Sequence, residues 1–450
     1  MFATKFSVAQ KAAPAYNILY SFEGGIILKL ELIAPAAPES GRKRKKALIP
    51  PLGLGLIAAL TPPEFDVSLT DEKVTAIDFQ KPADLVGITA LTVTAHRAYE
   101  IADAFRARGV KVILGGIHPS ILPEEAGQHA DAVVIGEAEG IWPNLLEDFK
   151  ANKLQRVYRD GGRPSLVGLP IPRRDLFAQG AYHIRNTIST TRGCPYSCSF
   201  CSVTSYFGHT YRTRPVEEIL REIETFRDRK FIAFVDDNIV GNPKFAKELF
   251  RALIPYKKKW AAQASVTVAR DDELLRLAAE SGCAGLLIGF ESLSPASLAS
   301  VGKKINVVDD YESVIRKIHS HGIAVHGFFI LGLDDDDEAV FERTVRFAQK
   351  MRLESAQFDC PTPYPGTALC ESWDKDGRII TKDWSQYGYK LVFEPKTMSR
   401  EALQKGQAWA WREFYSLPSV WRRVGLFRRN LVLLWVINLY YRAIWRRKPR

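Results

Sequence analysis

Three cysteines are the residues whose spacing indicates chemistry most clearly in this chain. Cys194, Cys198 and Cys201 stand in the run Thr191-Arg-Gly-Cys-Pro-Tyr-Ser-Cys-Ser-Phe-Cys-Ser202, with three residues between the first pair and two between the second. A loop of this length can bring three thiolates to one face of an iron-sulfur cluster, whereas clusters that only carry electrons usually take four cysteines. The fourth iron is then open to another ligand.

Two other roles for these cysteines stay open on the sequence alone. A structural zinc ion takes four Cys or His ligands, but the nearest histidine, His209, follows Cys201 by eight residues without a second one in register. A disulfide is less expected, because six cysteines in 450 residues without a secretory signal indicate a reducing compartment. We therefore expect a metal cluster in a cytoplasmic protein.

The cysteine run resembles the cluster loop of the radical SAM superfamily, in which S-adenosylmethionine chelates the open iron through its amino and carboxylate groups. The aromatic Phe200, directly before the third cysteine, belongs to the same pattern. The resemblance implies a [4Fe-4S] cluster on the three cysteines, S-adenosylmethionine as a second cofactor, and an electron donor of the flavodoxin or ferredoxin type.

Composition fits a folded protein with two or three cores. Of 450 residues, 46% are hydrophobic and 25% charged, with a formal net charge of +11. Two segments, 42–46 and 421–450, hold 14 of the 62 basic residues, which leaves 48 against 51 acidic ones. Because the rest of the chain is nearly neutral, no nucleic acid partner is expected.

The polar and cysteine-bearing segments must be positioned by two sets of alternating strands and helices. In residues 26–150 we expect strands at 26–34, 65–69, 85–89, 110–114 and 132–135, and helices at 52–60, 95–108 and 141–149. Strands joined by helices require right-handed crossovers, which predicts an α/β fold, a Rossmann-like doubly wound parallel sheet. Residues 1–25 show no clear period and are expected to be an extension without an assigned function.

Ligands of such a sheet bind at the carboxyl ends of its strands. The residues that follow the third, fourth and fifth strands are therefore candidates: Thr89, Leu91, Gly115, Gly116, His118, Gly136 and Glu137. The segment from about Leu28 to Phe149 resembles the cobalamin-binding domain that precedes many radical SAM domains. The resemblance implies that Thr89 to Leu91 and the glycine pair surround the nucleotide tail of the corrinoid.

One feature departs from that domain. No D-x-H-x-x-G motif follows the first strand, so a bound corrinoid is expected to lack a histidine below the cobalt. His118, beside Pro119, is expected to support a turn or contact the tail. A Rossmann-like fold that has lost its ligand is the alternative, and the basic run Arg42–Lys46 is expected to be a solvated loop, with a phosphate contact as its alternative.

A linker rich in Pro, Arg and Gly, residues 151–182, leads to a second unit at 183–370. Strands are expected at 183–190, 231–235, 262–268, 285–288, 324–331 and 355–360, with helices at 216–227, 243–253, 272–281, 309–319 and 338–351. Six such strands fit the partial (βα)6 barrel of the radical SAM family, whose chemistry lies at the carboxyl ends of the strands.

Asp236, Asp237 and Asn238 follow the second strand of this unit. The family usually carries there a Gly-Gly-Glu-like segment that binds the methionine amine, and acidic groups suit a cationic ammonium. An ordinary turn with an Asx cap is the alternative.

Further contacts to S-adenosylmethionine are implied after the fourth and fifth strands. Glu291, followed by Ser292, matches the residue that accepts hydrogen bonds from the ribose, and Ile330 with Gly332 resembles the segment that packs along the adenine. The acidic run 334–337 is expected to be a solvated helix cap. Cys360, at a strand end, is a minor candidate for the pocket, and the loop 361–367 resembles the barrel-closing loop that borders the substrate in cobalamin-type relatives.

Residues 371–450 are expected to form a helical region with a basic, aromatic tail. The apolar run 431–441 is shorter than the about 20 residues of a spanning helix. Its flanking arginines favour a helix lying on an anionic membrane surface, at the inner face of the membrane, and a helix packed on the barrel is the alternative.

Together these features predict a radical SAM enzyme, with cobalamin-dependent methylation of an unactivated carbon as the expected reaction and a small-molecule or lipid-like substrate. Radical cyclisation or rearrangement without methyl transfer is the alternative on the same scaffold. A non-catalytic corrinoid and cluster sensor is a further alternative, against which Asp236, Asp237 and Glu291 argue. No residue is assigned a catalytic role by the sequence.

Overall fold

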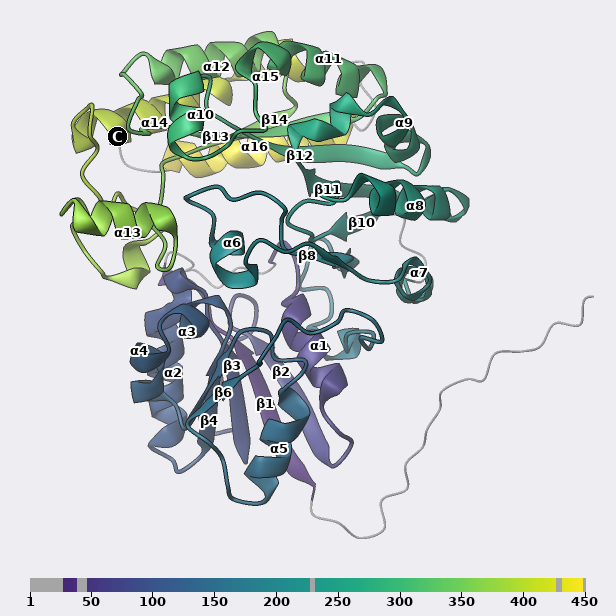
Figure 1. Ribbon diagram of the computed structural model, residues 1–450, viewed down its shortest axis with the longest axis vertical. Coiled ribbons are helices and arrows are strands. Elements are labelled where there is room, and N and C mark those ends of the chain that lie inside the picture. The colour runs from purple at the N-terminus through teal and green to yellow at the C-terminus, as the bar shows by residue number, and fades with distance from the viewer. Residues whose placement is uncertain (1–26, 39–46, 227–230, 426–430, 448–450) are drawn as a thin grey trace, which may run out of the picture.

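Two parallel sheets, one below the other in Figure 1, organise the chain. The structure, a computed structural model, describes residues 27–38, 47–226, 231–425 and 431–447. The expectations for residues 1–25 and for Arg42–Lys46 lie outside the described residues. Among the described residues, none of the helices is both long and apolar enough to cross a bilayer.

The N-terminal unit is a six-stranded parallel sheet in the order β2-β1-β3-β4-β5-β6. Its strands are β1 (Leu28–Ala34), β2 (Phe65–Asp71), β3 (Leu85–Thr89), β4 (Lys111–Gly115), β5 (Ala132–Ile135) and β6 (Val157–Arg159). Its helices are α1 (Leu52–Leu60), α2 (Ala95–Arg106), α3 (Ile117–Ile121), α4 (Pro123–His129) and α5 (Trp142–Lys150). The expected doubly wound sheet is confirmed.

Successive side chains of β1 point to opposite faces of the sheet, and both faces are covered by helices. Leu30 and Leu32 belong to the core under α1 and α5, whereas Ile33 belongs to the core under α2 and α4. Helices on both faces therefore leave the ends of the strands as the accessible edges of the sheet.

The barrel unit has the strand order β14-β13-β12-β11-β10-β7, all parallel. The strands are β7 (Thr187–Ile188), β10 (Phe231–Phe234), β11 (Lys259–Ala264), β12 (Cys283–Glu291), β13 (Ala324–Ile330) and β14 (Ser355–Asp359). The helices are α7 (Val216–Glu224), α8 (Pro243–Leu253), α9 (Asp272–Glu280), α10 (Pro295–Ser300), α11 (Tyr311–Ser320) and α12 (Val340–Lys350). An antiparallel pair, β8 (Thr191–Arg192) and β9 (Arg212–Thr213), flanks α6 (Ser202–Phe207).

Two expected strands of this unit are misplaced. The strand expected at 183–190 shrinks to β7, because its first residues pair elsewhere: the His183 and Ile184 amides donate to the carbonyls of Ala47 and Leu48. The strand expected at 262–268 ends at Ala264, because residues 266–270 form a 3-10 helix.

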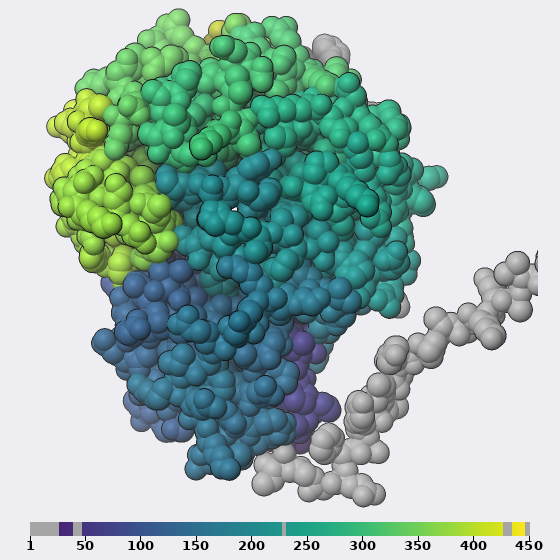
Figure 2. Space-filling model, in the orientation of Figure 1, coloured from purple at the N-terminus to yellow at the C-terminus, as the bar shows by residue number. Residues whose placement is uncertain are grey.

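The C-terminal region packs on the barrel unit. It contains α13 (Ala368–Lys375), α14 (Arg400–Phe414), α15 (Leu417–Val424) and α16 (Leu431–Arg447), and α14 and α16 lie against β14. Figure 2 shows the yellow-green surface of this region directly above the blue N-terminal unit. The indole nitrogen of Trp384 donates to the Glu125 carboxylate there, at 2.9 Å. The tail therefore takes the packed arrangement.

Candidate functional site

The three cysteines lie on one wall of a cavity of about 1600 Å³ at the carboxyl ends of the barrel strands. Their loop leaves β8 and enters α6 (Figure 1). Gly193, immediately before Cys194, has a φ of +86°, and a side chain there would collide with the carbonyl of Thr210. The sequence Arg-Gly-Cys therefore requires its glycine.

Asp236 anchors the start of this loop. Its carboxylate accepts hydrogen bonds from the backbone amides of Thr190, at 2.7 Å, and Thr191. It is buried, which raises its pKa to about 6, and it is not among the described residues that line the cavity. The structure thus places Asp236 behind the site predicted for it, as a support of the cysteine loop.

The donor set of the loop fits an iron-sulfur cube. Burial raises the pKa of all three thiols, that of Cys198 to about 11, so thiolates need a compensating positive charge there. The three cysteines face one cavity, yet the described residues contain no group of three Cys, His, Asp or Glu side chains placed to hold a single ion. Three thiols on one wall suit a cube in which each thiolate binds a different iron.

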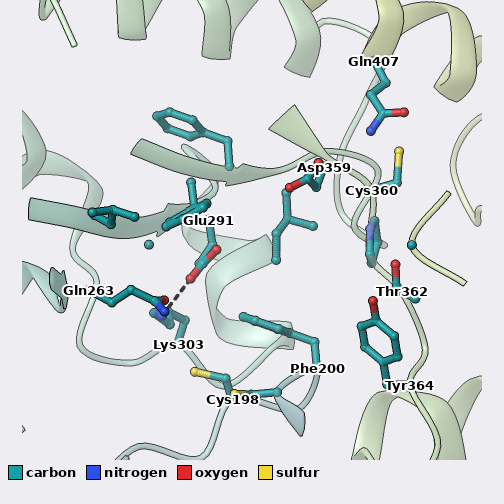
Figure 3. Close-up of a pocket in the computed structure, with 18 of the residues that line it drawn as sticks. Cys198, Phe200, Gln263, Glu291, Lys303, Asp359, Cys360, Thr362, Tyr364 and Gln407 are labelled. Carbon is teal, nitrogen blue, oxygen red and sulfur yellow. Dashed lines mark hydrogen bonds and ion pairs between the residues drawn. The ribbon is translucent and has the colours of Figure 1, made fainter. Parts of the chain in front are cut away.

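Lys303 supplies a positive charge beside the thiols (Figure 3). Its ammonium donates to the Glu291 carboxylate at 2.8 Å. Burial disfavours this charge, but Glu291 and the cysteines together hold the pKa of Lys303 above its ordinary value. Lys303 lies in the turn after α10 and was not predicted to be part of the site.

The backbone around Glu291 aims its side chain into the cavity. Glu291 has a φ of +66°, and the pairing of β12 with β13 shifts register between Gly289 and Glu291. A side chain at Gly289 would collide with the Glu291 carboxylate. Such strain persists only where surrounding contacts fix it, and it is common at ligand sites.

Several other expected residues lie on the cavity wall. They are Phe200, Asp237, Asn238, Ile330 and Cys360. Asn238 is fixed by Ser265, whose amide donates to its side-chain oxygen at 3.1 Å. Burial, with the neighbouring Asp236, raises the pKa of Asp237 to about 6.

Ser292 and Gly332 are not among the described residues that line the cavity. The amide of Gly332 donates to Asp336, at 3.0 Å, and a side chain at Gly332 would meet Leu403 at 2.6 Å. The expectation that the run 334–337 is solvated is wrong for Asp336, which is buried and also accepts from Ser297. Its role is to fix the turn after β13.

The cavity is also lined by residues that were not predicted. Apart from Lys303, they are Gln263 and Ser265 on β11 and its following turn, Asp359 at the end of β14, and several residues of α14 and α16. Thr362 and Tyr364 also line the cavity, and they belong to the loop 361–367 that was expected to border the substrate. Gln263 fell inside an expected strand that was placed three residues too late. The strand-end rule could have found Asp359, whereas nothing local indicated the residues of α14 and α16.

In the N-terminal unit, the carboxyl ends of β3, β4 and β5 form an edge that fits a flat cofactor. Leu91 is 53% exposed there. A side chain at Gly136, whose φ is +87°, would meet no atom within 4 Å, and Gly115 leaves space up to Val134 at 3.6 Å. Thr89 packs against Gly116, whose φ of +99° requires glycine.

The side chains of His118 and Glu137 are held by protein partners at this edge. The ring of His118 is buried between Thr92 and Glu125, each at 3.3 Å from a ring nitrogen, and burial lowers its pKa. Glu137 accepts hydrogen bonds from Arg192 and Arg212 of the other unit. The structure therefore shows Glu137 in ion pairs with the other unit, and its contact with the cofactor stays a prediction.

Comparison with known proteins gives the same two domains. The radical SAM superfamily model matches residues 188–348, and the B12 binding domain model matches residues 45–146. Bacteriochlorophyllide d C-12(1)-methyltransferase of Chlorobaculum tepidum is 34% identical over 421 residues, 90% of this chain and 91% of that protein. Bacteriochlorophyllide d C-8(2)-methyltransferase of the same organism is 31% identical over 387 residues, 80% of this chain and 86% of that protein.

Among solved structures, the cobalamin-dependent S-adenosylmethionine radical enzyme OxsB superposes with a TM-score of 0.70 at 15% identity, over 93% of this chain and 72% of that one. This similarity concerns the fold. The matched domains imply a [4Fe-4S] cluster, S-adenosylmethionine and cobalamin as cofactors, for which the residues described above provide fitting sites. The chain therefore belongs to the radical SAM superfamily, among its cobalamin-dependent methyltransferases.

Proposed function

We propose that this enzyme methylates an unactivated carbon of a tetrapyrrole macrocycle, with S-adenosylmethionine as the source of the methyl group. The cavity carries the proposal: its about 1600 Å³ exceed the roughly 300–1,000 Å³ of a usual small-molecule pocket. It is continuous from the cysteines to the C-terminal helices and has space for a large substrate beside the cofactor. Two relatives that match over most of their length act, by name, on bacteriochlorophyllide d.

The bound cofactors supply hydrogen abstraction by a 5'-deoxyadenosyl radical and a transferable methyl group, while the protein supplies binding, orientation and exclusion of water. Cys194, Cys198 and Cys201 would hold the cluster. In the N-terminal unit, Gly136 and the loops at Thr89 to Leu91 and Gly115–Gly116 would hold the corrinoid.

The other predicted residues of the cavity wall would contact different parts of S-adenosylmethionine. Glu291 would accept hydrogen bonds from ribose hydroxyls, and its contact with Lys303 fixes its position. Asp237 and Asn238 would face the ammonium of S-adenosylmethionine, and that positive charge favours the ionised form of the Asp237 carboxyl, which is otherwise disfavoured by burial. Phe200 and Ile330 would pack against the adenine. Reductive cleavage of S-adenosylmethionine also requires an electron donor, which we expect to be a flavodoxin or ferredoxin.

Anaerobic reconstitution with a reductant, bacteriochlorophyllide d and trideuteromethyl S-adenosylmethionine tests the proposal. We expect macrocycle that has gained one labelled methyl group, together with 5'-deoxyadenosine and S-adenosylhomocysteine. The Cys198→Ala variant, which lacks one cluster ligand, should form none of the three. 5'-Deoxyadenosine with unlabelled, altered substrate would indicate cyclisation or rearrangement, and absence of all products from the loaded enzyme would favour the sensor.

Peripheral contact with the inner face of the membrane stays a proposal. The outer face of α15 and α16 exposes Trp421, Val436, Leu439 and Tyr440, and such a surface beside arginines suits an anionic bilayer. Flotation with liposomes containing phosphatidylglycerol tests it, with the double variant Trp421→Ser and Tyr440→Ser as the comparison. If the wild type and the double variant were recovered equally in the unbound fraction, the proposed membrane contact would be contradicted.

A further inference from the structure

One segment of the C-terminal region, residues 384–392, contacts both units. Trp384, Tyr387 and Val392 are buried in the hydrophobic core of the N-terminal unit that includes α2. Residues 388–391, which lie between them in the sequence, line the cavity that contains the cysteines. Helix α13, which precedes this segment, lies directly above α3 and α4 in Figure 1. The segment 384–392 therefore connects the core of one unit with the cavity of the other.

The loop at the end of β3, for which we proposed the corrinoid contact, is held by one buried residue. The amide of His118 donates to the carbonyl of Ala90 at 3.1 Å, and its Nδ1 atom lies 3.3 Å from the hydroxyl of Thr92. Ala90 and Thr92 flank Leu91, whose side chain is exposed at this edge. His118 therefore fixes the position of the loop from inside the unit.

The same ring is connected to Trp384 through Glu125. The Nε2 atom of His118 lies 3.3 Å from Oε1 of Glu125, and the indole nitrogen of Trp384 donates to this carboxylate at 2.9 Å. Burial lowers the pKa of His118, which favours a neutral ring with a single N–H group. A carboxylate only accepts hydrogen bonds, so Nε2 carries the proton and Nδ1 accepts from the Thr92 hydroxyl. Three hydrogen bonds therefore form a continuous path from Thr92 to Trp384.

Most of this path is shielded from water. The side chain of His118 is fully buried, Thr92 is 7% and Trp384 8% exposed, and the Glu125 side chain is partly exposed. Hydrogen bonds in such surroundings are stronger than in water, and breaking one leaves a buried donor or acceptor without a partner. The positions of Thr92 and Trp384 therefore depend on each other.

We propose that these residues form a positioning relay, which couples the loop 89–92 at the corrinoid edge to the cavity wall at 388–391. The relay consists of Thr92, His118, Glu125 and Trp384. A corrinoid on the loop would fix the Thr92 hydroxyl, and the relay would then hold Trp384 and the adjoining cavity wall in place. The inference rests on the proposed corrinoid site for the ligand, and on the contacts of the four residues for the relay.

Hydrogen–deuterium exchange of the reconstituted enzyme, without reductant, measures the coupling. Saturation with hydroxocobalamin should slow the exchange of residues 384–392 in the wild type by at least roughly fivefold, the lower end of usual coupling between sites. Thr92→Val keeps the shape of the side chain but removes its hydroxyl, so saturation should no longer slow the exchange there. Thr92→Ser retains a hydroxyl and should show the effect of the wild type.

Equilibrium dialysis with hydroxocobalamin tests the relay from its other end. Because coupling between two sites is reciprocal, Trp384→Phe, which removes the indole donor, should weaken binding by at least roughly threefold. Tyr99→Phe is the matched control, because Tyr99 donates to the same carboxylate at 2.9 Å but is not part of the path from Thr92 to Trp384. It should keep both the affinity and the slower exchange.

The outcomes separate the relay from the corrinoid site. Slower exchange that persists in Thr92→Val would indicate direct contact of the corrinoid with residues 384–392 and would overturn the relay. Unchanged affinity in Trp384→Phe, or loss of the slower exchange in Tyr99→Phe, would overturn it as well. A wild type that binds no hydroxocobalamin would overturn the proposed corrinoid site together with the relay.

Discussion

Glu137 forms ion pairs that connect the N-terminal unit with the barrel unit. We therefore expect the isosteric substitution Glu137→Gln to weaken the contact between the two units. Glu137 is 9% exposed and accepts from Arg192 and Arg212, while Glu139 also pairs with Arg192. Arg192 lies two residues before Cys194. These carboxylates therefore hold the end of β5 against the start of the cysteine loop.

The other side of the loop is tied to the same strand. Tyr206, in the helix after Cys201, donates its hydroxyl to the carbonyl of Gly136 at 2.7 Å. Because the contacts of Gly136 and Glu137 surround the cysteine loop, they set the distance between the open edge of the N-terminal unit and the cluster. We infer that Glu137 is a positioning residue for the two cofactor sites.

The loss of interaction free energy between the two units depends on the partners that the two arginines keep in Glu137→Gln. Within the part of the chain that the structure describes, Arg192 keeps Glu139, whereas Arg212 keeps the carbonyl of Pro164 alone. The loss is then that of a hydrogen bond to a charged group, about 1.5–3 kcal/mol, and less than the 3–5 kcal/mol of a buried pair broken completely. The population in which the two units separate should rise roughly ten- to hundredfold.

Hydrogen–deuterium exchange measures this opening directly. Peptides covering residues 132–140 and 190–206 should exchange roughly ten- to hundredfold faster in the variant, while α9 should not change. Turnover should become less coupled, with more 5'-deoxyadenosine for each methyl group transferred. Glu124→Gln, an exposed residue of the same unit, is the control. Wild-type exchange in both peptides of Glu137→Gln would refute the positioning role.

Three further predictions follow from single contacts. Lys303→Met should keep its iron content but bind S-adenosylmethionine at least roughly tenfold more weakly, because Glu291 loses the ammonium at 2.8 Å; an unchanged response of the cluster's electron paramagnetic resonance signal to the cofactor would contradict this. Burial lowers the pKa of His326 to about 4, so as the pH falls the unfolded chain is protonated first. Between pH 7 and pH 5, the free energy of unfolding should therefore fall by about 2 kcal/mol from this residue; His326→Gln should lose that part of the slope in chemical denaturation, and an identical slope would exclude the assignment. Asn438→Leu should lower the free energy of unfolding by about 2–3 kcal/mol, because it leaves Arg423 with one acceptor fewer in the core; wild-type stability in urea would show that α16 does not depend on this bond.

The strands of the N-terminal unit could be predicted within a few residues, because apolar runs of four to seven residues with flanking turns persist in the structure. Strand β6 was missed, since only one of its three residues is buried. In the barrel unit, residues 183–184 looked like the start of a strand but pair with residues 47–48. Local pattern identifies an extended segment, and the choice of its partner depends on the whole fold.

The cysteines could be predicted because their geometry is contained in one short loop. The role of Glu137 could not, because the rule that residues after a strand bind ligands ignores what a second domain presents to that edge. Here the second domain presents Arg192 and Arg212, whose guanidinium groups form ion pairs with the Glu137 carboxylate. Asp236 shows the same limit, since its neighbour Asp237 faces the cavity while Asp236 faces the backbone of Thr190.

The sequence of α16 contains a signal that distinguishes a protein surface from a bilayer as the partner of the helix. An apolar helix with flanking arginines fits a bilayer surface or a protein surface equally well, because both accept apolar side chains. Leu434, Asn438, Tyr441 and Trp445 are spaced by four, three and four residues and so share one face of α16. A helix on a bilayer would turn its amide away from the lipid, whereas Asn438 lies in the middle of the apolar stripe. A buried amide needs hydrogen-bond partners, which the Glu354 carbonyl and Arg423 provide. The position of one polar residue within an apolar stripe therefore favours a protein partner for that face, and the opposite face, with Val436 and Tyr440, is the part of the helix still available to a membrane.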